Sequence, residues 1–245
     1  MPTDATLDRF LTGLSDLAPV AVWAHGSLAG GDYREGHSDL DLIAVLDDPV
    51  TARTVWRVAL LHARLRAEPL AEKLHCTYLT PGTAAGADRR HLTWAHGQLF
   101  KRPVSAVTRR ELHTFGRVLH GVRPAGLLPP VPDHELRAYL VRDQRDYWRP
   151  AVDHAPRWRQ DVWVDVGLTT FARASVTLRD GRLITKRESL AELLTLGAPA
   201  EVVEDIRLRR YDRPDPPTEE WTARRGQLVR GYLGPAIDAL VASYA

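Results

Sequence analysis

Apolar residues in the first half of the chain recur at two spacings, one typical of helices and one typical of strands. Apolar side chains that recur three and four residues apart predict amphipathic helices, whereas short apolar runs bounded by turn residues predict strands. The predicted helices cover residues 3–17, 51–67 and 109–119. The predicted strands cover residues 20–23, 40–46, 73–79 and 92–94, and the Gly- and Ala-rich stretch 81–88 predicts a loop. This mixture indicates a mixed sheet flanked by helices.

The second half of the chain shows only helical spacing. Residues 122–132 contain four prolines and a glycine, too many for a regular element, and indicate a domain boundary. The predicted helices beyond it cover residues 133–148, 161–178, 185–196, 199–208 and 218–244. Thr185 and Glu188 match a capping box. We therefore expect an α+β domain at 1–122, a linker at 123–132 and an all-α helical bundle at 133–245.

Composition narrows the class of protein. The chain has 245 residues, 44% of them apolar and 26% charged, which is typical of a globular protein. A net charge of +2 makes no strong case for nucleic-acid binding. The single cysteine, Cys76, excludes an intramolecular disulfide and fits a reducing compartment. The N-terminal residues have no long apolar run, so we expect a cytoplasmic protein without a membrane span or signal peptide. We also expect a monomer.

The stretch 22–46 concentrates the candidate chemistry. Alternation along the second strand places Asp39 and Asp41 on one face of the sheet. Two carboxylates that converge repel each other unless a cation lies between them, and oxygen ligands suit Mg²⁺. Gly26 lets the backbone approach a phosphate and the Ser27 hydroxyl can donate to its oxygens, which indicates a nucleotide. The alternative is a surface turn followed by a strand with solvated aspartates.

Gly26-Ser27, followed after eleven residues by Asp39 and Asp41, resembles the signature of the nucleotidyltransferase superfamily. The resemblance implies in-line attack of a hydroxyl on the α-phosphorus of a nucleotide, with Mg²⁺ stabilising the developing charge. In this superfamily a third strand contributes a further active-site group, which here would be His75. The alternative for His75 is a half-buried side chain bonded to a backbone carbonyl.

Residues 147–165 combine three tryptophans with three aspartates, a composition that suits a hydroxylated, cationic ligand. The alternative is that the tryptophans are core residues and the aspartates are helix caps or solvated. The aromatic and acidic candidates for substrate binding are Trp94, Trp148, Asp153, Asp161 and Asp165. On the helix 161–178, Asp165 and Arg173 lie on roughly one side, so Arg173 is a candidate phosphate contact. The alternative is an arginine that forms a salt bridge on the protein surface.

The whole chain is similar to the streptomycin/spectinomycin adenylyltransferase family of aminoglycoside-modifying enzymes. The resemblance rests on Gly26-Ser27, the run Ser38 to Leu42, the Pro-rich joint, and Arg173 followed by Thr185-Lys186. It implies that ATP and Mg²⁺ bind in a cleft between the domains. Gly26, Ser27 and Ser38 would seat the triphosphate, Arg173 and Lys186 would contact its phosphates, and Trp148 and Asp153 would hold the acceptor.

One position departs from the family. Its members carry a glutamate base on the third strand where this chain has His75. A neutral histidine can accept a hydroxyl proton but adds no negative charge to a metal site. We therefore predict an ATP- and Mg²⁺-dependent enzyme that adenylylates a hydroxyl of an aminoglycoside-like acceptor. The alternatives are a nucleotide-binding regulatory module, and transfer of AMP to a protein or tRNA; the low net charge argues against tRNA.

Overall fold

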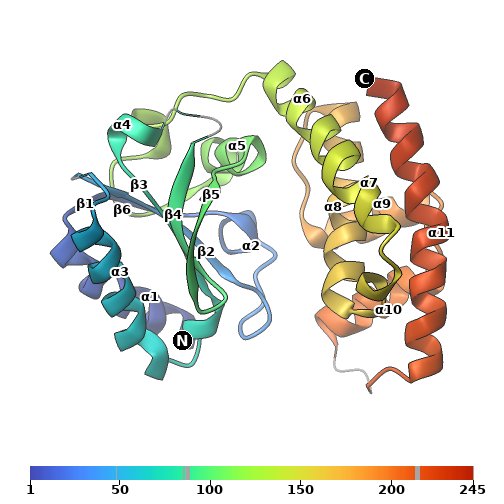
Figure 1. Ribbon diagram of the computed structural model, residues 1–245, viewed down its shortest axis with the longest axis horizontal. Helices are drawn as coiled ribbons and strands as arrows, with labels where there is room; N and C mark the ends of the chain where they lie inside the picture. The colour runs from blue at the N-terminus through green and yellow to red at the C-terminus, as the bar shows by residue number, and fades with distance from the viewer. Residues whose placement is uncertain (48, 85, 87–88, 213–215, 245) are drawn as a thin grey trace. The chain divides into compact units, whose positions relative to one another are not determined.

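The computed structural model describes residues 1–47, 49–84, 86, 89–212 and 216–244. Contacts divide the chain into two compact units, Met1–Val131 and Pro132–Ala245. Unit 1 contains the sheet and unit 2 is helical (Figure 1). Each unit has its own hydrophobic core, so each is described by itself.

Within the described residues, unit 1 is built on a six-stranded sheet with the order β5-β4-β3-β2-β1-β6. The strands are β1 (Pro19–Ala24), β2 (Leu40–Leu46), β3 (Leu74–Leu79), β4 (Arg90–Ala95), β5 (Gln98–Pro103) and β6 (Arg117–Gly121). β2 and β3 are parallel, and the other neighbouring pairs are antiparallel. The predicted mixed sheet is therefore confirmed, with two strands more than the sequence indicated.

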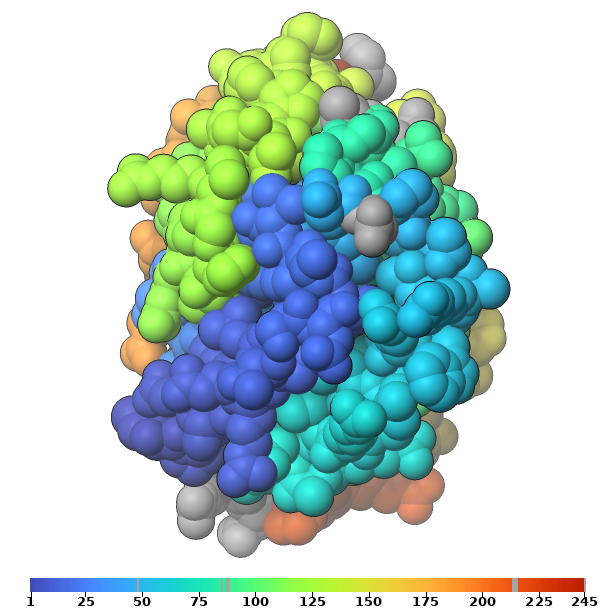
Figure 2. All heavy atoms as spheres, turned by 90° about the vertical axis from the view of Figure 1, so that its left-hand side faces the viewer, coloured from blue at the N-terminus to red at the C-terminus, as the bar shows by residue number. Residues whose placement is uncertain are grey.

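Helices cover both faces of this sheet. They are α1 (Pro2–Leu14), α2 (Gly26–Gly30), α3 (Ala52–Arg64), α4 (Pro81–Ala84) and α5 (Ala106–Phe115), with 3-10 turns at Ser15–Leu17, Leu65–Ala67, Ala71–Lys73 and Pro124–Gly126. Phe10 of α1 and Val58 of α3 pack on one face against Leu42 and Cys76. Leu112 of α5 packs on the other face. Figure 2 views unit 1 from the side covered by α1 and α3.

Three predictions in unit 1 need correction. The helix expected at 109–119 ends at Phe115, and Arg117–Gly121 instead pairs with β1 as an edge strand. β5 was missed because its side chains are mostly polar and exposed, so no apolar alternation marks it. The expected loop 81–88 begins with the short helix α4, and residues 85, 87 and 88 lie outside the described residues.

The helices expected in unit 2 are present. They are α6 (Asp133–Asp143), α7 (Arg149–Val152), α8 (Asp161–Asp180), α9 (Lys186–Thr195), α10 (Ala200–Tyr211) and α11 (Glu219–Tyr244), with a π-helical turn at Gln144–Trp148 and a 3-10 turn at Ala155–Arg159. The capping box before α9 is confirmed, because Thr185 and Glu188 each accept the other's backbone N–H. No helix in the described ranges is long and apolar enough to cross a membrane.

A buried histidine in unit 1 makes stability depend on pH. His62 stacks on Trp94 with ring centroids 4.4 Å apart, and its Nε2 lies 2.7 Å from the Tyr78 hydroxyl. Burial lowers the pKa of His62 to about 3. Between pH 6.5 and 3 the unfolded chain therefore binds a proton that the folded chain does not, so stability falls with falling pH by up to about 1.4 kcal/mol per unit.

We expect His62→Gln to remove this contribution, because glutamine does not titrate and can still bond the Tyr78 hydroxyl. Urea unfolding at pH 7, 6 and 5 measures the slope of the unfolding free energy. His120→Gln is the matched control, since His120 is exposed and should leave the slope unchanged. An equal slope in all three proteins would contradict the expected protonation of His62 on unfolding.

Candidate active site

Two acidic side chains and one histidine meet where β2 and β3 begin. Asp41 and His75 are register partners in the parallel pair β2·β3, so alternation places them on the same face. His75 Nδ1 lies 3.7 Å from Asp41 Oδ1 and 3.9 Å from Asp39 Oδ2. The structure thus brings together the three residues that the sequence predicted as the catalytic group.

The charge state of Asp41 reflects this environment. Burial raises the pKa of the carboxyl, but the nearby His75 and His25 imidazoles favour the charged form and outweigh burial. The pKa of Asp41 consequently lies below its usual value. A negative charge is therefore held at Asp41, the second residue of β2, where it attracts cations.

The Gly26 turn packs directly against Asp41. Gly26 has a φ of +59°, and a Cβ there would lie 2.8 Å from Asp41 Oδ2. The backbone N–H of the preceding residue, His25, donates to the Asp41 carbonyl oxygen at 3.0 Å. Only glycine combines this conformation with this approach, so the Gly-Ser turn and the aspartate pair form one cluster.

Ser27 and Ser38 flank the same cluster. Ser27 is the second residue of α2, and its carbonyl accepts the N–H of Asp32 at 3.3 Å. The Ser38 hydroxyl accepts the N–H of Arg34 at 3.1 Å, so Ser38 closes the loop that leads into Asp39. Its side chain is buried. Ser38 therefore holds the loop in shape.

Three neighbours of the cluster were not identified from the sequence. Lys73 Nζ lies 3.8 Å from Asp39 Oδ1, and the His25 ring lies 3.4 Å from Glu111 Oε2. His25 could have been found, because alternation along β1 continues to it on the face that also carries Asp41. Glu111 could not, because it comes from α5, which is 85 residues away along the chain from Gly26.

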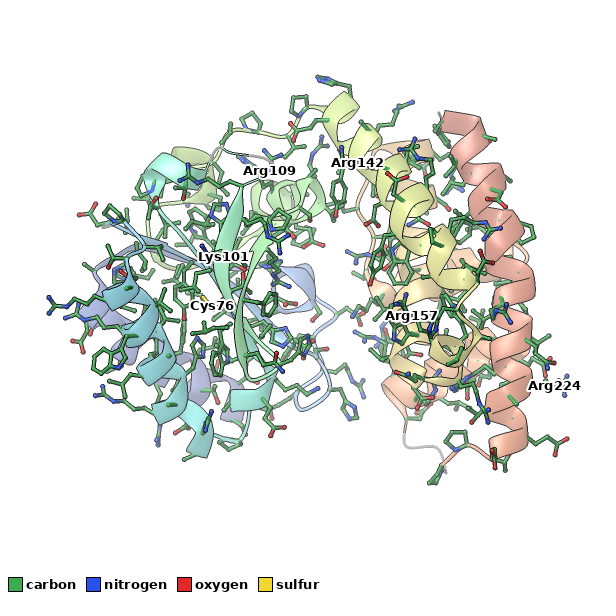
Figure 3. The ribbon with its side chains drawn as sticks, viewed as in Figure 1. Cys76, Lys101, Arg109, Arg142, Arg157 and Arg224 are labelled. Atoms are coloured by element: carbon green, nitrogen blue, oxygen red, sulfur yellow. The ribbon has the colours of Figure 1, made fainter. Side chains whose placement is uncertain are left out.

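His75 is almost enclosed. Its side chain is 6% exposed, its Nε2 is buried without a hydrogen-bond partner among the described residues, and its ring meets His96 edge-on at 4.4 Å. Nδ1 is therefore the nitrogen that faces the aspartates. In Figure 3 the label Cys76 marks the neighbouring residue of β3, whose side chain points into the core on the opposite face.

The donor set fits a hard divalent cation through two carboxylates. Asp39 and Asp41 keep side-chain exposures of 41% and 29%, and both approach the same His75 nitrogen. Within the part of the chain that the structure describes, no three His, Cys, Asp or Glu side chains form a ready metal centre. Asp39 and Asp41 are thus the residues of this cluster suited to holding Mg²⁺, with remaining positions left to water and phosphate.

Unit 2 brings two of its predicted phosphate contacts close together. Arg173 of α8 donates through Nε to the Ile184 carbonyl at 2.9 Å. Ile184 comes two residues before Lys186, the first residue of α9. Arg173 therefore lies beside the start of α9, where Lys186 adds a second positive charge.

The other predicted residues of unit 2 have internal partners. The Trp148 indole is buried and donates to Asp143 at 3.1 Å. Asp153 is exposed and pairs with Arg149 at 3.1 Å. Two further ion pairs join helices within this unit, Asp161 with Arg225 at 2.6 Å and Asp165 with Arg209 at 2.6 Å.

Trp94 lies away from the cluster. It is the register partner of Cys76, which places its indole on the α1–α3 face of the sheet, stacked on His62. The aspartates and His75 are on the other face. Its predicted contact with substrate is therefore withdrawn, because a buried core indole on the far side of the sheet is not available to a ligand at the cluster.

Comparison with known proteins defines the class. Residues 7–118 match the nucleotidyltransferase domain family, so unit 1 carries a nucleotidyltransferase domain. No curated protein matches the chain. Among solved structures, the chain is similar to the spectinomycin adenyltransferase AAD(9) from Enterococcus faecialis, whose crystal structure contains ATP and spectinomycin. The match has a TM-score of 0.71 and 16% identity over 96% of this chain and 97% of that chain. The predicted fold class, a mixed sheet with helices followed by an all-α part, is confirmed.

Proposed function

We propose that the chain is an ATP- and Mg²⁺-dependent nucleotidyltransferase that adenylylates a hydroxyl of an aminoglycoside-like small molecule. The observation that carries this proposal is the convergence of Asp39, Asp41 and His75 beside the Gly26 turn. These groups combine two carboxylates, a backbone turn without a side chain and an imidazole. That set suits nucleotide chemistry and has no evident structural purpose at the edge of a core.

The residues of the cluster in unit 1 have distinct parts in the proposed reaction. Asp39 and Asp41 would hold Mg²⁺, which would supply positive charge to the phosphates. Ser27 and Ser38 lie beside the triphosphate, and Gly26 lets the backbone approach it. The acceptor oxygen forms a bond to the α-phosphorus as the bond to pyrophosphate breaks. His75, in the neutral form that carries its ring proton on Nε2, takes the hydroxyl proton at Nδ1, the nitrogen on the side of the aspartates.

Two basic residues of unit 2 stay candidates for nucleotide binding. The family resemblance implies that Arg173 and Lys186 contact phosphate oxygens. Trp148, Asp153, Asp161 and Asp165 were predicted to hold the acceptor, but their carboxylates and indole already bond within the unit. An acceptor with few ammonium groups is therefore favoured over a polycationic one, and spectinomycin, present in the AAD(9) structure, is the first to try.

The direct test measures pyrophosphate release from ATP with Mg²⁺ and a panel of aminoglycosides and spectinomycin. We expect release that depends on one acceptor, together with a product heavier by one AMP in mass spectrometry. Asp39→Asn is the matched control and should abolish both signals. If the unmodified protein and Asp39→Asn behave identically with every acceptor, the proposed reaction is wrong.

A second function, a nucleotide-binding regulatory module, is favoured by one observation. The third-strand group is a nearly enclosed histidine, where the family carries a glutamate. Calorimetry separates the two functions. ATP binding without turnover, which His75→Glu does not restore, would support the regulatory module, whereas turnover by the unmodified protein would exclude it.

A further inference from the structure

We propose that Glu111 is a positioning residue that fixes the Gly26 turn against Asp41. The inference rests on the proposed function, since the turn is where the triphosphate would bind. Glu111 Oε2 accepts the Gly26 N–H at 3.3 Å and lies 3.4 Å from His25 Nδ1. One carboxylate oxygen thus bonds two successive residues at the point where β1 passes into α2.

The position of Glu111 is set by a well-anchored helix. Ser105 caps α5 by accepting the Thr108 N–H at 3.0 Å, and Leu112, the next residue after Glu111, is buried in the core under the sheet. At the other end of α2, the Phe115 ring lies 3.4 Å from the place of a Cβ on Gly30. α5 therefore supports α2 at both of its ends, Gly26 and Gly30.

Burying the Glu111 carboxylate costs desolvation free energy, which its hydrogen-bond partners must offset. Its side chain is 6% exposed, and a buried charge is tolerated only where it is paired or hydrogen-bonded. The neighbouring N–H and imidazole supply those bonds. The free energy they contribute is tied to the conformation of the turn, because the Gly26 N–H meets Glu111 only while the turn is in the conformation that packs Gly26 on Asp41.

The hydrogen-bond donors of the turn have different partners. The Gly26 N–H is used inside the protein by Glu111, so the triphosphate is left with the donors of Ser27. If Glu111 is lost, the turn can shift by fractions of an ångström, and a displacement of that order in a positioning group costs much of the binding of a phosphate. Glu111 thus acts on ATP through Gly26 and does not touch the nucleotide.

The test compares Glu111→Leu, Glu111→Asp and Glu111→Gln with the unmodified full chain. Leucine removes the acceptor, and aspartate keeps the charge but is one methylene too short to reach Gly26. We expect both to raise KM for ATP by about ten- to a hundredfold, with kcat at saturating ATP changed less than threefold. Glutamine keeps a carbonyl oxygen at the same reach and should stay within about threefold in KM.

Two controls separate this role from a general loss of structure. His113→Leu changes the same helix on a side that contacts Pro129, and should leave KM unchanged. ATP affinity by calorimetry must follow KM. If the unmodified protein binds ATP and Glu111→Leu and Glu111→Asp bind it equally well, the positioning role is wrong while the proposed function stands. If Glu111→Leu does not fold, Glu111→Asp alone decides between these outcomes. If the unmodified protein itself binds no ATP, the proposed function fails, and this inference with it.

Discussion

Asp41→Asn is expected to lower nucleotidyl transfer by about 10²–10³-fold, because it removes a charge that the site holds in place. The pKa of Asp41 is below its usual value despite burial, so the carboxylate is negative at neutral pH. Asparagine keeps the shape of the side chain beside Gly26 and His75 but cannot neutralise a divalent cation. Initial rates of pyrophosphate release at saturating ATP measure the loss, and binding of Mn²⁺ followed by its paramagnetic resonance spectrum should weaken in parallel.

Asp47→Asn is the matched control. Asp47 follows the last residue of the same strand and is exposed, so the identical substitution there should leave both rate and metal binding unchanged. A transfer rate for Asp41→Asn within a factor of three of the unmodified protein would contradict the assignment of Asp41 to the metal. Equal thermal midpoints for the two variants would show that the effect is not a loss of fold.

The sequence predicted the cluster well because strand alternation is a local rule. Alternation alone put Asp39 and Asp41 on one face, whereas the place of His75 beside them was implied by the resemblance to the nucleotidyltransferase superfamily. The parallel register of β2 and β3 brings the three residues together. The Gly26 turn could be predicted for the same reason, since its conformation and its distance along the chain from Asp39 are properties of a few consecutive residues. The core helices α1 and α3 followed from apolar spacing alone.

The remainder of the site depends on contacts that no local pattern encodes. Glu111 reaches Gly26 only because α5 packs on the sheet, and a single glutamate on an amphipathic helix is otherwise typical of a solvated face. Trp94 was misassigned because a tryptophan on a short strand does not reveal its face until the register with β3 is known. β5 and β6 are edge strands with exposed polar side chains, so pairing, and not hydrophobicity, defines them.

The tryptophan- and aspartate-rich segment illustrates how partners change the meaning of a composition. Alone, Asp161 and Asp165 suggest attraction for cationic groups. In the structure Arg209 and Arg225 lie against them, and Arg157, marked in Figure 3, stacks its guanidinium over Trp163 at 4.5 Å. Arginines far along the chain thus neutralise the carboxylates. Under the proposed function, these carboxylates are therefore not free to attract the ammonium groups of an acceptor.

Arg225→Met is expected to lower the unfolding free energy by about 1.5–3 kcal/mol, because it removes the charged hydrogen bonds that a fully buried guanidinium makes to Asp205 and Asp161. Arg225 is fully buried and donates to Asp205 at 2.9 Å, to Asp161 at 2.6 Å and to the Arg159 carbonyl at 3.3 Å. These bonds join α11 to α10 and to the start of α8. Methionine preserves most of the stem volume, so the loss reports the ionic contacts and not a cavity.

Arg224→Met provides the comparison, since the neighbouring Arg224 is exposed, as Figure 3 shows, and its ion pair with Glu201 at 2.8 Å lies at the surface. Such a surface pair contributes about 0–1 kcal/mol, so the urea midpoint of Arg224→Met should stay close to that of the unmodified protein. If Arg225→Met and Arg224→Met unfold at the same urea concentration, the ion pair between Asp161 and Arg225 does not stabilise the packing of the helices. The Asp161 carboxylate would then be available to an acceptor, and polycationic aminoglycosides would become the better candidates.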